Sequence, residues 1–217
     1  MSRSRVIPGR PEPATAPVAE GRRERPAPKS SNLAREVRII GGQWKRSKLP
    51  VADAPGLRPT PDRVRETLFN WLGQDLDGWR VLDAFAGSGA LGFEAASRGA
   101  AEVLLLERDA ALVRSLQASH LRLKAENLRV ECSDALAWMA RAAPARFELV
   151  LLDPPFGQDL FLPALTAAAS LLVAGGLVYL EAPELLAAPA GLGLEPWKSG
   201  RAGAVHYQLL RKIATDG

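Results

Sequence analysis

The sequence predicts an α/β protein with a mostly parallel seven-stranded sheet, helices on both faces and an antiparallel strand at its C-terminal edge. From residue 80 onward, short runs of apolar residues alternate with segments of helical periodicity. Continuous apolar strands between helices are typical of a parallel sheet that is covered on both faces. The last such segment, residues 194–212, has the pattern of a β-hairpin instead. A small basic hairpin ahead of the sheet completes the expected architecture.

Length and composition limit this fold to one sizeable core. The chain has 217 residues, of which 47% are hydrophobic, and that is too little for a second large domain. No apolar run approaches the roughly 20 residues that span a bilayer, and the N-terminus lacks the apolar region of a signal peptide. The single cysteine, Cys132, excludes a disulfide framework and a cysteine-rich zinc site, and its place within a strand predicts burial. We expect a cytoplasmic protein without a metal.

Residues 1–34 differ in character from the rest of the chain. They hold 6 of the 17 prolines and almost no large apolar residue, so they cannot bury enough surface to offset the entropy of ordering. We expect a disordered tail.

Positive charge is concentrated in the first part of the chain. Residues 1–70 hold 15 Lys and Arg against 7 Asp and Glu, whereas residues 71–217 hold 13 against 17. This surplus fits a polyanionic partner or a merely solubilising tail, and charge alone does not decide between them.

Residues 35–58 form the predicted basic hairpin. The stretch REVRIIGGQWKRSKLPV contains two short strand-like pieces, with Gly41-Gly42 at the turn or bulge between them. Lys45, Arg46 and Lys48 lie on the return. A hairpin so rich in positive charge is a candidate surface for nucleic acid.

A helix follows within residues 60–73. Thr60 is the expected N-cap, Pro61 the first helical residue, and Gly73 the end of the helix. Its core-facing side is the apolar stripe of Val64, Leu68, Trp71 and Leu72. Arg63, Glu66 and Asn70 share another face, and core packing does not account for them.

The parallel sheet is predicted from five apolar strands and the helices between them. The strands are 80–86, 102–107, 128–134, 147–153 and 176–183, and the helices are 89–99, 109–124, 135–143 and 160–172.

A glycine-rich loop follows the first of these strands. Residues 87–92 match G-x-G-x-x-G, and Glu107 ends the next strand, 20 residues beyond Gly87. Glycines allow the backbone to approach a ligand, and an acidic residue at this place binds ribose hydroxyls. NAD and S-adenosylmethionine (SAM) are both compatible with this pattern. Asp83 favours SAM, because a carboxylate repels the pyrophosphate of NAD but attracts the ammonium and sulfonium groups of SAM.

The stretch FELVLLDPPFGQD ends an apolar strand on Asp153-Pro154-Pro155-Phe156. Proline donates no ladder hydrogen bond and restricts the residue before it, so the strand ends here and the four residues become rigid. The Asp153 carboxylate and the Pro154 carbonyl can accept both hydrogens of an exocyclic amine and stabilise the charge that grows as it attacks a methyl group. Phe156 can stack on the base. Together with the glycine loop, this pattern predicts methylation of an amino group on a planar ring.

Four stretches carry a resemblance to a known family: RIIGGQWKRSKLP, GLRPTPDRVRETLFNWL, LDAFAGSGALGFEAASRGA and DPPF. From about residue 35 to residue 211 the chain resembles the RsmD-type 16S rRNA guanine-N2 methyltransferases. The resemblance implies a Rossmann-like, class I SAM-dependent methyltransferase domain over residues 59–217, preceded by the hairpin. It also implies methyl transfer from SAM to the N2 of one guanine in 16S rRNA, within 30S particles, by a monomer.

The resemblance further implies a role for individual residues. SAM would contact Asp83, Phe85, Gly87, Gly89, Gly92, Glu107 through its ribose, Asp134 through its adenine amine, and Arg63 through its carboxylate. An ion pair between Arg63 and Glu66 fits the sequence as well. The catalytic residues would be Asp153, Pro154, Pro155 and Phe156, and the rRNA would contact the basic residues Arg38, Lys45, Arg46, Lys48 and Arg58.

Three other interpretations stay open. A non-catalytic RNA-binding module would need the basic N-terminal part but neither the glycine loop nor DPPF. An NAD oxidoreductase would need a substrate domain that this chain is too short to supply. An adenine-N6 methyltransferase acting on DNA or RNA shares the DPPF chemistry and is the main alternative, because the residues by themselves do not name the nucleotide.

Overall fold

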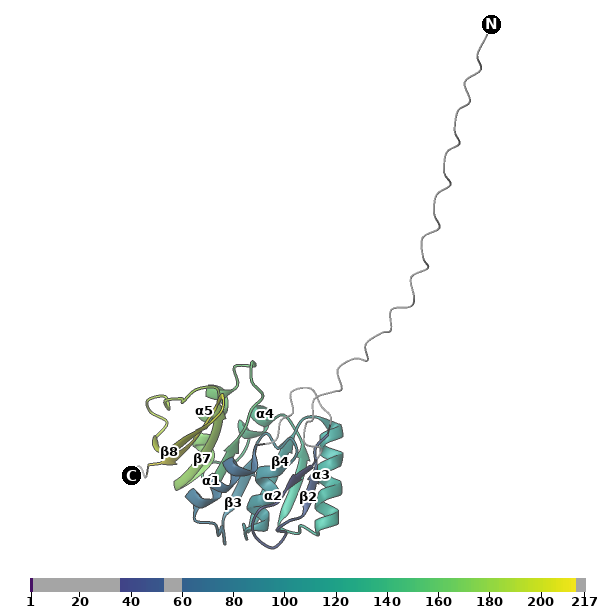
Figure 1. Cartoon of the computed structure of the whole chain (residues 1–217). Helices are drawn as coiled ribbons and strands as arrows, with labels where there is room; N and C mark the ends of the chain where they lie inside the picture. The colour runs from purple at the N-terminus through teal and green to yellow at the C-terminus, as the bar shows by residue number, and fades with distance from the viewer. Residues whose placement is uncertain (2–35, 53–59, 214–217) are drawn as a thin grey trace. The chain divides into compact units, whose positions relative to one another are not determined.

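The computed structural model describes Met1 and residues 36–52 and 60–213. The expected tail therefore lies, apart from Met1, outside the described residues, and so does Arg58. The elements described belong to the unit Leu33–Gly217. Figure 1 labels its helices and strands.

A seven-stranded sheet forms the centre of this unit, as predicted. Its strands are β3 (Arg80–Asp83), β4 (Glu102–Glu107), β5 (Leu128–Cys132), β6 (Phe147–Leu152), β7 (Leu172–Ala182), β8 (Leu194–Ala202) and β9 (Val205–Lys212). Their order is β5-β4-β3-β6-β7-β9-β8. β3 to β7 are parallel, whereas β9 runs antiparallel to both β7 and β8. The antiparallel strand is thus second from the edge, because the hairpin folds β9 inward and leaves β8 outermost.

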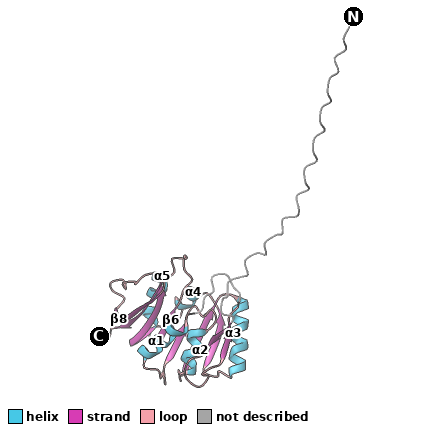
Figure 2. Cartoon of the chain, viewed as in Figure 1, coloured by secondary structure: helices cyan, strands magenta, loops and turns pink. Residues whose placement is uncertain are grey.

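Helices cover the sheet on both faces (Figure 2). α1 (Asp62–Leu72), α2 (Ala90–Ser97) and α3 (Ala110–Leu123) pack on one face, and their buried side chains share a core with the inward residues of the strands. α4 (Ala135–Met139) and α5 (Phe161–Leu171) bury a second core on the other face. Neighbouring strand residues such as Val81 and Leu82 belong to different cores, since successive side chains of a strand point to opposite faces.

The helix α1 begins differently from the prediction. Its N-cap is Pro61, with no side-chain cap, so the expected capping by Thr60 is wrong. The Thr60 hydroxyl instead donates to Glu181 at 2.8 Å, a partner 121 residues away. The predicted end is right: Gly73 has φ 95° and its N–H caps the helix. The apolar stripe is buried, except that Trp71 is half-buried and packs with Tyr207, their ring centroids 5.5 Å apart.

The predicted hairpin is present as β1 (Glu36–Arg38) paired antiparallel with β2 (Lys48–Pro50). Val37, Ile39 and Leu49 are buried in the core that α1, α2 and α3 share. The turn after β1 is fixed to the end of α2. Ser97 accepts the Gln43 N–H at its carbonyl and the Trp44 N–H at its hydroxyl, at 2.8 and 2.9 Å. The hairpin is therefore seated on the helices rather than projecting from them.

Two findings concern expectations drawn from the composition: the burial of Cys132 and the search for membrane-spanning helices. Cys132 is exposed, so its expected burial is wrong. It is the last residue of β5, the edge strand, where one side of the sheet has no neighbouring strand. Within the described ranges, no helix combines the length and the apolar character needed to cross a membrane.

Candidate active site

The acidic residues predicted from the motifs gather at one edge of the sheet. Asp83 and Glu107 end β3 and β4, while Asp134 and Asp153 follow β5 and β6. These strands are parallel, so their carboxyl ends meet at the same edge. The strand order reverses between β3 and β6, and ligands of open α/β sheets bind beside such a reversal.

The loop between β3 and α2 is held by the Glu107 carboxylate. One oxygen, Oε2, accepts the Gly87 N–H at 2.9 Å, and Oε1 accepts the Asp109 N–H at 2.9 Å. Two backbone donors fix the orientation of the carboxylate, and Glu107 stays partly exposed. Its remaining lone pairs can accept hydrogen bonds from a diol, which suits the ribose predicted at this position.

The glycines of this loop are required by packing. Gly89 has φ 77°, and a Cβ there would lie 2.7 Å from atoms of Leu116 and Phe93. A Cβ on Gly92 would lie 2.7 Å from Leu105. The third glycine, Gly87, has φ 52° and is partly exposed, so it is the one whose backbone stays accessible to a ligand. The sequence pattern did not distinguish these roles.

Asp83 lies beneath the loop and is 1% exposed. Its Oδ2 accepts the Gly92 N–H at 2.9 Å, so the carboxyl ties the end of β3 to the first turn of α2. Burial raises the pKa of Asp83 to about 7, against the lowering effect of the Gly92 N–H; the nearby charge of Glu107 raises it further. Contact of this carboxyl with SAM stays a prediction.

Three other residues predicted for SAM surround this edge. The exposed Asp134 caps α4 by accepting the Ala137 N–H at its Oδ1, at 2.9 Å, which leaves the lone pairs of Oδ2 to accept from a ligand. Phe85 is partly buried and packs on the core that α4 and α5 cover. Arg63 is exposed on the first turn of α1, and no ion pair with Glu66 occurs among the described residues.

The DPPF segment ends β6 at the same edge. Asp153 is partly exposed and Pro154 is buried, whereas Pro155 is exposed. The Phe156 ring is 49% exposed and contacts Phe161, the centroids 5.7 Å apart. Burial of its carboxyl raises the pKa of Asp153 well above its usual range, and the charges of Glu181 and Asp83 add to this effect. An exposed ring beside a poorly solvated carboxyl offers a platform for a base and an acceptor for its amine.

Among the buried polar groups that escaped the sequence analysis, those of Glu181 and Arg65 bear most directly on the site. Glu181 lies at the end of β7, beside Asp153, and accepts hydrogen bonds from the hydroxyls of Thr60 and Tyr179. Asp83 and Asp153 were singled out because an acidic residue ends an apolar strand. Glu181 has the same position in the predicted strand 176–183, so the sequence offered the same signal for it. The second group is the guanidinium of Arg65, which helical periodicity places next to the core-facing stripe of α1.

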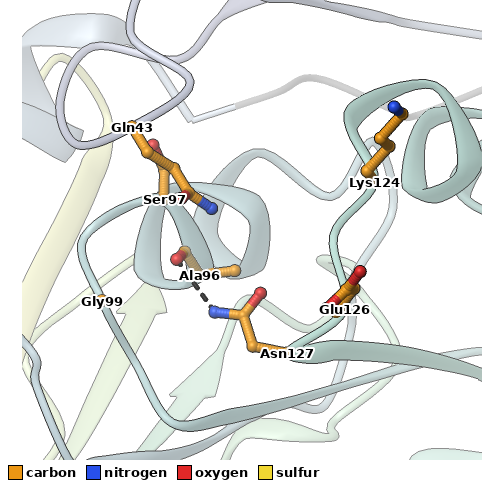
Figure 3. A pocket seen from close by; sticks show the side chains of 7 residues that line it. All are labelled: Gln43, Ala96, Ser97, Gly99, Lys124, Glu126 and Asn127. Carbon is orange, nitrogen blue, oxygen red and sulfur yellow. Dashed lines mark hydrogen bonds between the residues drawn. The ribbon is translucent and has the colours of Figure 1, made fainter.

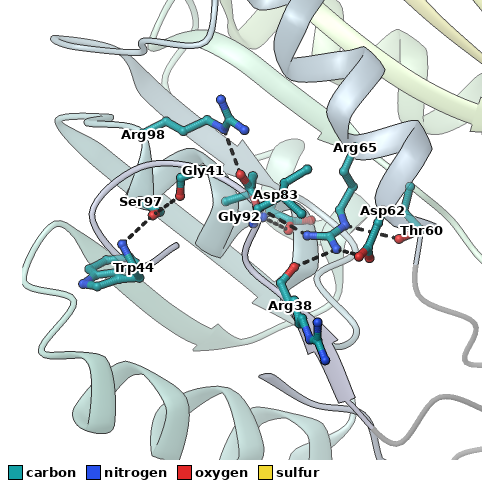
Figure 4. Close-up of polar contacts among 12 residues, drawn as sticks. Arg38, Gly41, Trp44, Thr60, Asp62, Arg65, Asp83, Gly92, Ser97 and Arg98 are labelled. Carbon is teal, nitrogen blue, oxygen red and sulfur yellow. Dashed lines mark hydrogen bonds and ion pairs between the residues drawn. The ribbon is translucent and has the colours of Figure 1, made fainter. Parts of the chain in front are cut away.

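Arg65 is fully buried and connects three parts of the chain (Figure 4). It donates to the Arg38 carbonyl at 2.8 Å, the Asp62 carboxylate at 2.6 Å and the Glu94 carboxylate at 3.3 Å, and its Nε donates to the Thr60 carbonyl at 3.3 Å. The hairpin, the start of α1 and the middle of α2 are therefore tied together below the edge of the sheet where Asp83 and Asp153 lie.

The basic residues of the hairpin are exposed, but its turn lies at the opposite edge of the sheet. The turn contacts Ser97 at the C-terminal end of α2. The N-terminal end of α2 lies at the other edge of the sheet, where Asp83 and Asp153 are. Lys45 and Arg46 are in this turn. Since eight residues of helix rise about 12 Å, an RNA that touched both the turn and Asp153 would have to run along the face of α1 and α2.

A pocket of about 430 Å³ lies at this opposite edge (Figure 3). Gly99 and Asn127, which line it, precede β4 and β5. The Asn127 amide donates to the carbonyls of Ala96 and Ala100, at 3.1 and 2.8 Å, so it holds the end of α2 in place. The pocket is remote from the predicted catalytic residues.

The comparisons with known proteins decide the family. A family model described as conserved hypothetical protein 95 matches residues 37–211. Ribosomal RNA small subunit methyltransferase D of Escherichia coli is 44% identical over 188 residues, which cover 82% of this chain and 91% of the relative. The protein of the same name from Haemophilus influenzae is 41% identical over 155 residues, 69% of this chain and 80% of the relative. The chain belongs to this family. The resemblance drawn from its motifs is thus confirmed.

Solved structures agree with this assignment. A putative methyltransferase from Escherichia coli superimposes with a TM-score of 0.75 at 39% identity and covers 83% of this chain and 99% of its own. A putative methylase from Haemophilus influenzae gives 0.70 at 34% identity, covering 82% and 99%. The Rossmann-like methyltransferase fold predicted from the sequence is confirmed.

Proposed function

We propose that this protein transfers a methyl group from SAM to the exocyclic N2 amine of a guanine in 16S rRNA of the small ribosomal subunit. The observation that carries the proposal is the DPPF segment, rigid at the carboxyl end of β6 and next to the glycine loop of β3. Relatives named ribosomal RNA small subunit methyltransferase D support the substrate class. The protein is proposed to act on 30S particles in the cytoplasm, as a monomer.

The residues at the sheet edge fit SAM. When bound, SAM supplies a methyl group activated by a sulfonium cation. The oriented carboxylate of Glu107 would hold its ribose, the exposed carboxylate of Asp134 its adenine amine, and the backbone at Gly87 its amino-acid part. A cationic ligand would stabilise the ionised forms of Asp83 and Asp153, whereas a pyrophosphate would be repelled by them, and this supports SAM over NAD.

Asp153 and Pro154 would bind the substrate amine. Its lone pair is delocalised into the ring, so it is a poor nucleophile. Hydrogen bonds from both amine hydrogens to the Asp153 carboxylate and the Pro154 carbonyl favour a pyramidal nitrogen and stabilise the positive charge that develops on it. The half-exposed ring of Phe156 would stack on the base and fix its orientation.

The rRNA would lie against the face formed by the hairpin, α1 and α2. Arg38, Lys45, Arg46 and Lys48 are exposed on this face or at its far end, which suits contacts to phosphates rather than to the target base. Lys48 also pairs with Glu36 at 2.7 Å, a pair more than half exposed on both sides. Such a pair is weak, so Lys48 can exchange Glu36 for a phosphate.

The decisive test is methylation of 30S particles by Asp153 variants, with methylated nucleotides mapped by mass spectrometry. Asp153→Ala should fold and bind SAM but lose methyl transfer. Asp153→Asn should lose about 10²–10³-fold in single-turnover rate if the charge stabilises the developing cation, and far less if the residue only accepts a hydrogen bond. Asp159→Asn changes an exposed carboxyl in the same loop and is the matched control.

Two outcomes would contradict the proposal. Wild-type rates from Asp153→Ala would mean that DPPF only terminates a strand. A methyl group mapped to the N6 of adenine would instead establish the main alternative, because that amine can use the same acceptors.

A further inference from the structure

Three carboxyls lie together at the carboxyl ends of neighbouring strands. Leu152 of β6 pairs with Leu180 of β7, so Asp153 and Glu181, one residue further along, are neighbours on adjacent strands. Asp83 pairs with Leu151, two residues before Asp153, and therefore points to the same face of the sheet. Asp83 and Glu181 are 1% and 5% exposed, so water screens the charges of this group poorly.

Glu181 is held by two hydroxyls. Thr60 and Tyr179 donate to the same oxygen, Oε1, at 2.8 and 2.9 Å, and both donors are buried. Hydrogen bonds to a carboxylate favour its ionised form. In the part of the chain that the structure describes, no lysine or arginine forms an ion pair with Glu181. The negative charge of Glu181 therefore acts on its neighbour, Asp153.

We propose that Glu181, fixed by Thr60 and Tyr179, is a positioning residue that increases the proton affinity of Asp153 so that Asp153 can take the proton released by the methylated amine. This inference rests on the proposed function. In the proton transfer, an N–H bond of the amine breaks and an O–H bond forms on Asp153. The positive charge of the nitrogen and the negative charge of the carboxylate are both neutralised.

The physical reason is that two neighbouring carboxyls, one buried and one partly exposed, resist being ionised together where water screens their charges poorly. They release their protons in two steps that belong to the pair. Glu181, stabilised by two hydroxyls, loses its proton first, and its charge then makes Asp153 the more basic member. A general base works best when its pKa lies near the working pH. Burial raises the pKa of both carboxyls, and the charge of Glu181 adds to the effect on Asp153.

The other titratable groups around this pair come from four elements. Asp83 lies on β3, Tyr179 on β7 and Tyr207, the register partner of Glu181, on β9. Arg65 of α1 contacts the Thr60 carbonyl, but its guanidinium is paired with Asp62 and Glu94. His206 pairs with Ala182, so it points to the opposite face of the sheet from Glu181.

The test measures the titration of Asp153 directly and then its effect on the reaction. Carboxyl carbons of the full-length protein, labelled with ¹³C at aspartate, are titrated by NMR, and Asp153 is assigned by the signal missing in Asp153→Asn. In Glu181→Gln we expect the midpoint of Asp153 to fall by about one pH unit or more. The acidic limb of the single-turnover pH–rate profile on 30S particles should move in the same direction. His206→Gln, the control, should move neither.

A Tyr179 variant keeps the inference testable should Glu181→Gln fail to fold. Tyr179→Phe removes one of the two donors to Glu181, so Glu181 holds its proton more tightly and Asp153 ionises at lower pH; we expect a smaller shift in the same direction. An Asp153 midpoint that Glu181→Gln leaves unchanged or raises overturns the inference. Absence of RNA methylation by the wild type overturns the proposed function instead, and the NMR titration still decides the coupling.

Discussion

Replacing Asp83 by Asn tests whether a buried carboxyl holds its proton at neutral pH. Asp83 is 1% exposed, and burial raises its pKa from 3.8 to about 7. Unfolding returns the carboxyl to water and to its ordinary pKa. Asn has nearly the same shape, and its amide oxygen can still accept the Gly92 N–H that Asp83 accepts at 2.9 Å. The variant therefore removes the titration while it keeps the contact.

The magnitude follows from proton linkage. A pKa raised by folding stabilises the folded state fully below about pH 4, and this contribution is lost as the pH rises to about 7. From pH 5 to about pH 6.5 the folded carboxyl holds a proton that the unfolded one has released, and at pH 7 it is about half ionised. Each pH unit lowers the free energy of unfolding by at most about 1.4 kcal/mol, so the interval from pH 5 to pH 7 amounts to roughly 2 kcal/mol.

The assay is urea unfolding of wild type and Asp83→Asn at pH 5, 6, 7 and 8, followed by tryptophan fluorescence. Asp153 and Glu181 also have raised pKa values. The slope of Glu181 cancels in the comparison, and that of Asp153, whose pKa the charge of Asp83 raises, adds to the fall in the same direction. The wild-type free energy of unfolding, relative to that of the variant, should fall by roughly 2 kcal/mol from pH 5 to pH 7. A difference that does not change with pH would refute the reasoning, because Asp83 would then ionise in the folded protein as it does in water.

The remaining predictions concern binding and packing. Glu107→Ala should weaken SAM binding by about 1.5–3 kcal/mol for each charge-assisted ribose bond lost, measured by calorimetry; strong binding of NAD with none of SAM would contradict the assignment. Replacing Lys45, Arg46 and Lys48 by Ala should reduce the salt dependence of rRNA binding by up to about 0.7–0.9 log units per lost phosphate contact and leave SAM affinity unchanged; an unaltered salt slope would remove the hairpin from the interface. Arg65→Met should lower the free energy of unfolding by about 3–5 kcal/mol, because it removes an ion-pair partner of the buried Glu94 and the donor to the Thr60 and Arg38 carbonyls; a loss below about 1 kcal/mol in urea unfolding would contradict that role.

The position of the acidic residues at one edge of the sheet could be predicted from the sequence, because it depends on local patterns. An apolar run that ends in an acidic residue, as at Asp83, Glu107 and Asp153, locates the carboxyl end of a buried strand. Parallel strands then bring those ends together without any knowledge of long-range contacts. The fold class followed from the same alternation of strands and helices.

The errors came from contacts between distant segments. Thr60 has the local pattern of an N-cap, but its hydroxyl bonds to Glu181, 121 residues away. Arg65 was not singled out by the sequence, and its partners include the Arg38 carbonyl and Glu94. Cys132 lies within an apolar pattern, but on the strand at the edge of the sheet. The pattern of one segment does not show which distant residues its side chains contact. These partners could therefore not be predicted from separate segments.

The hairpin makes its polar contacts to the helices mainly through its backbone, which leaves its exposed side chains less constrained. The polar contacts that fix it use main-chain atoms of the hairpin: the Arg38 and Gly41 carbonyls accept hydrogen bonds, and the Ile40 and Trp44 N–H groups donate them. Main-chain atoms stay the same whichever side chain is present. The exposed positions of the hairpin are thus free to exchange residues at little expense in stability, apart from Gly42, where a Cβ would lie 1.7 Å from the Ser97 carbonyl oxygen. Selection can vary the surface that we propose for rRNA while the candidate site and its scaffold remain intact.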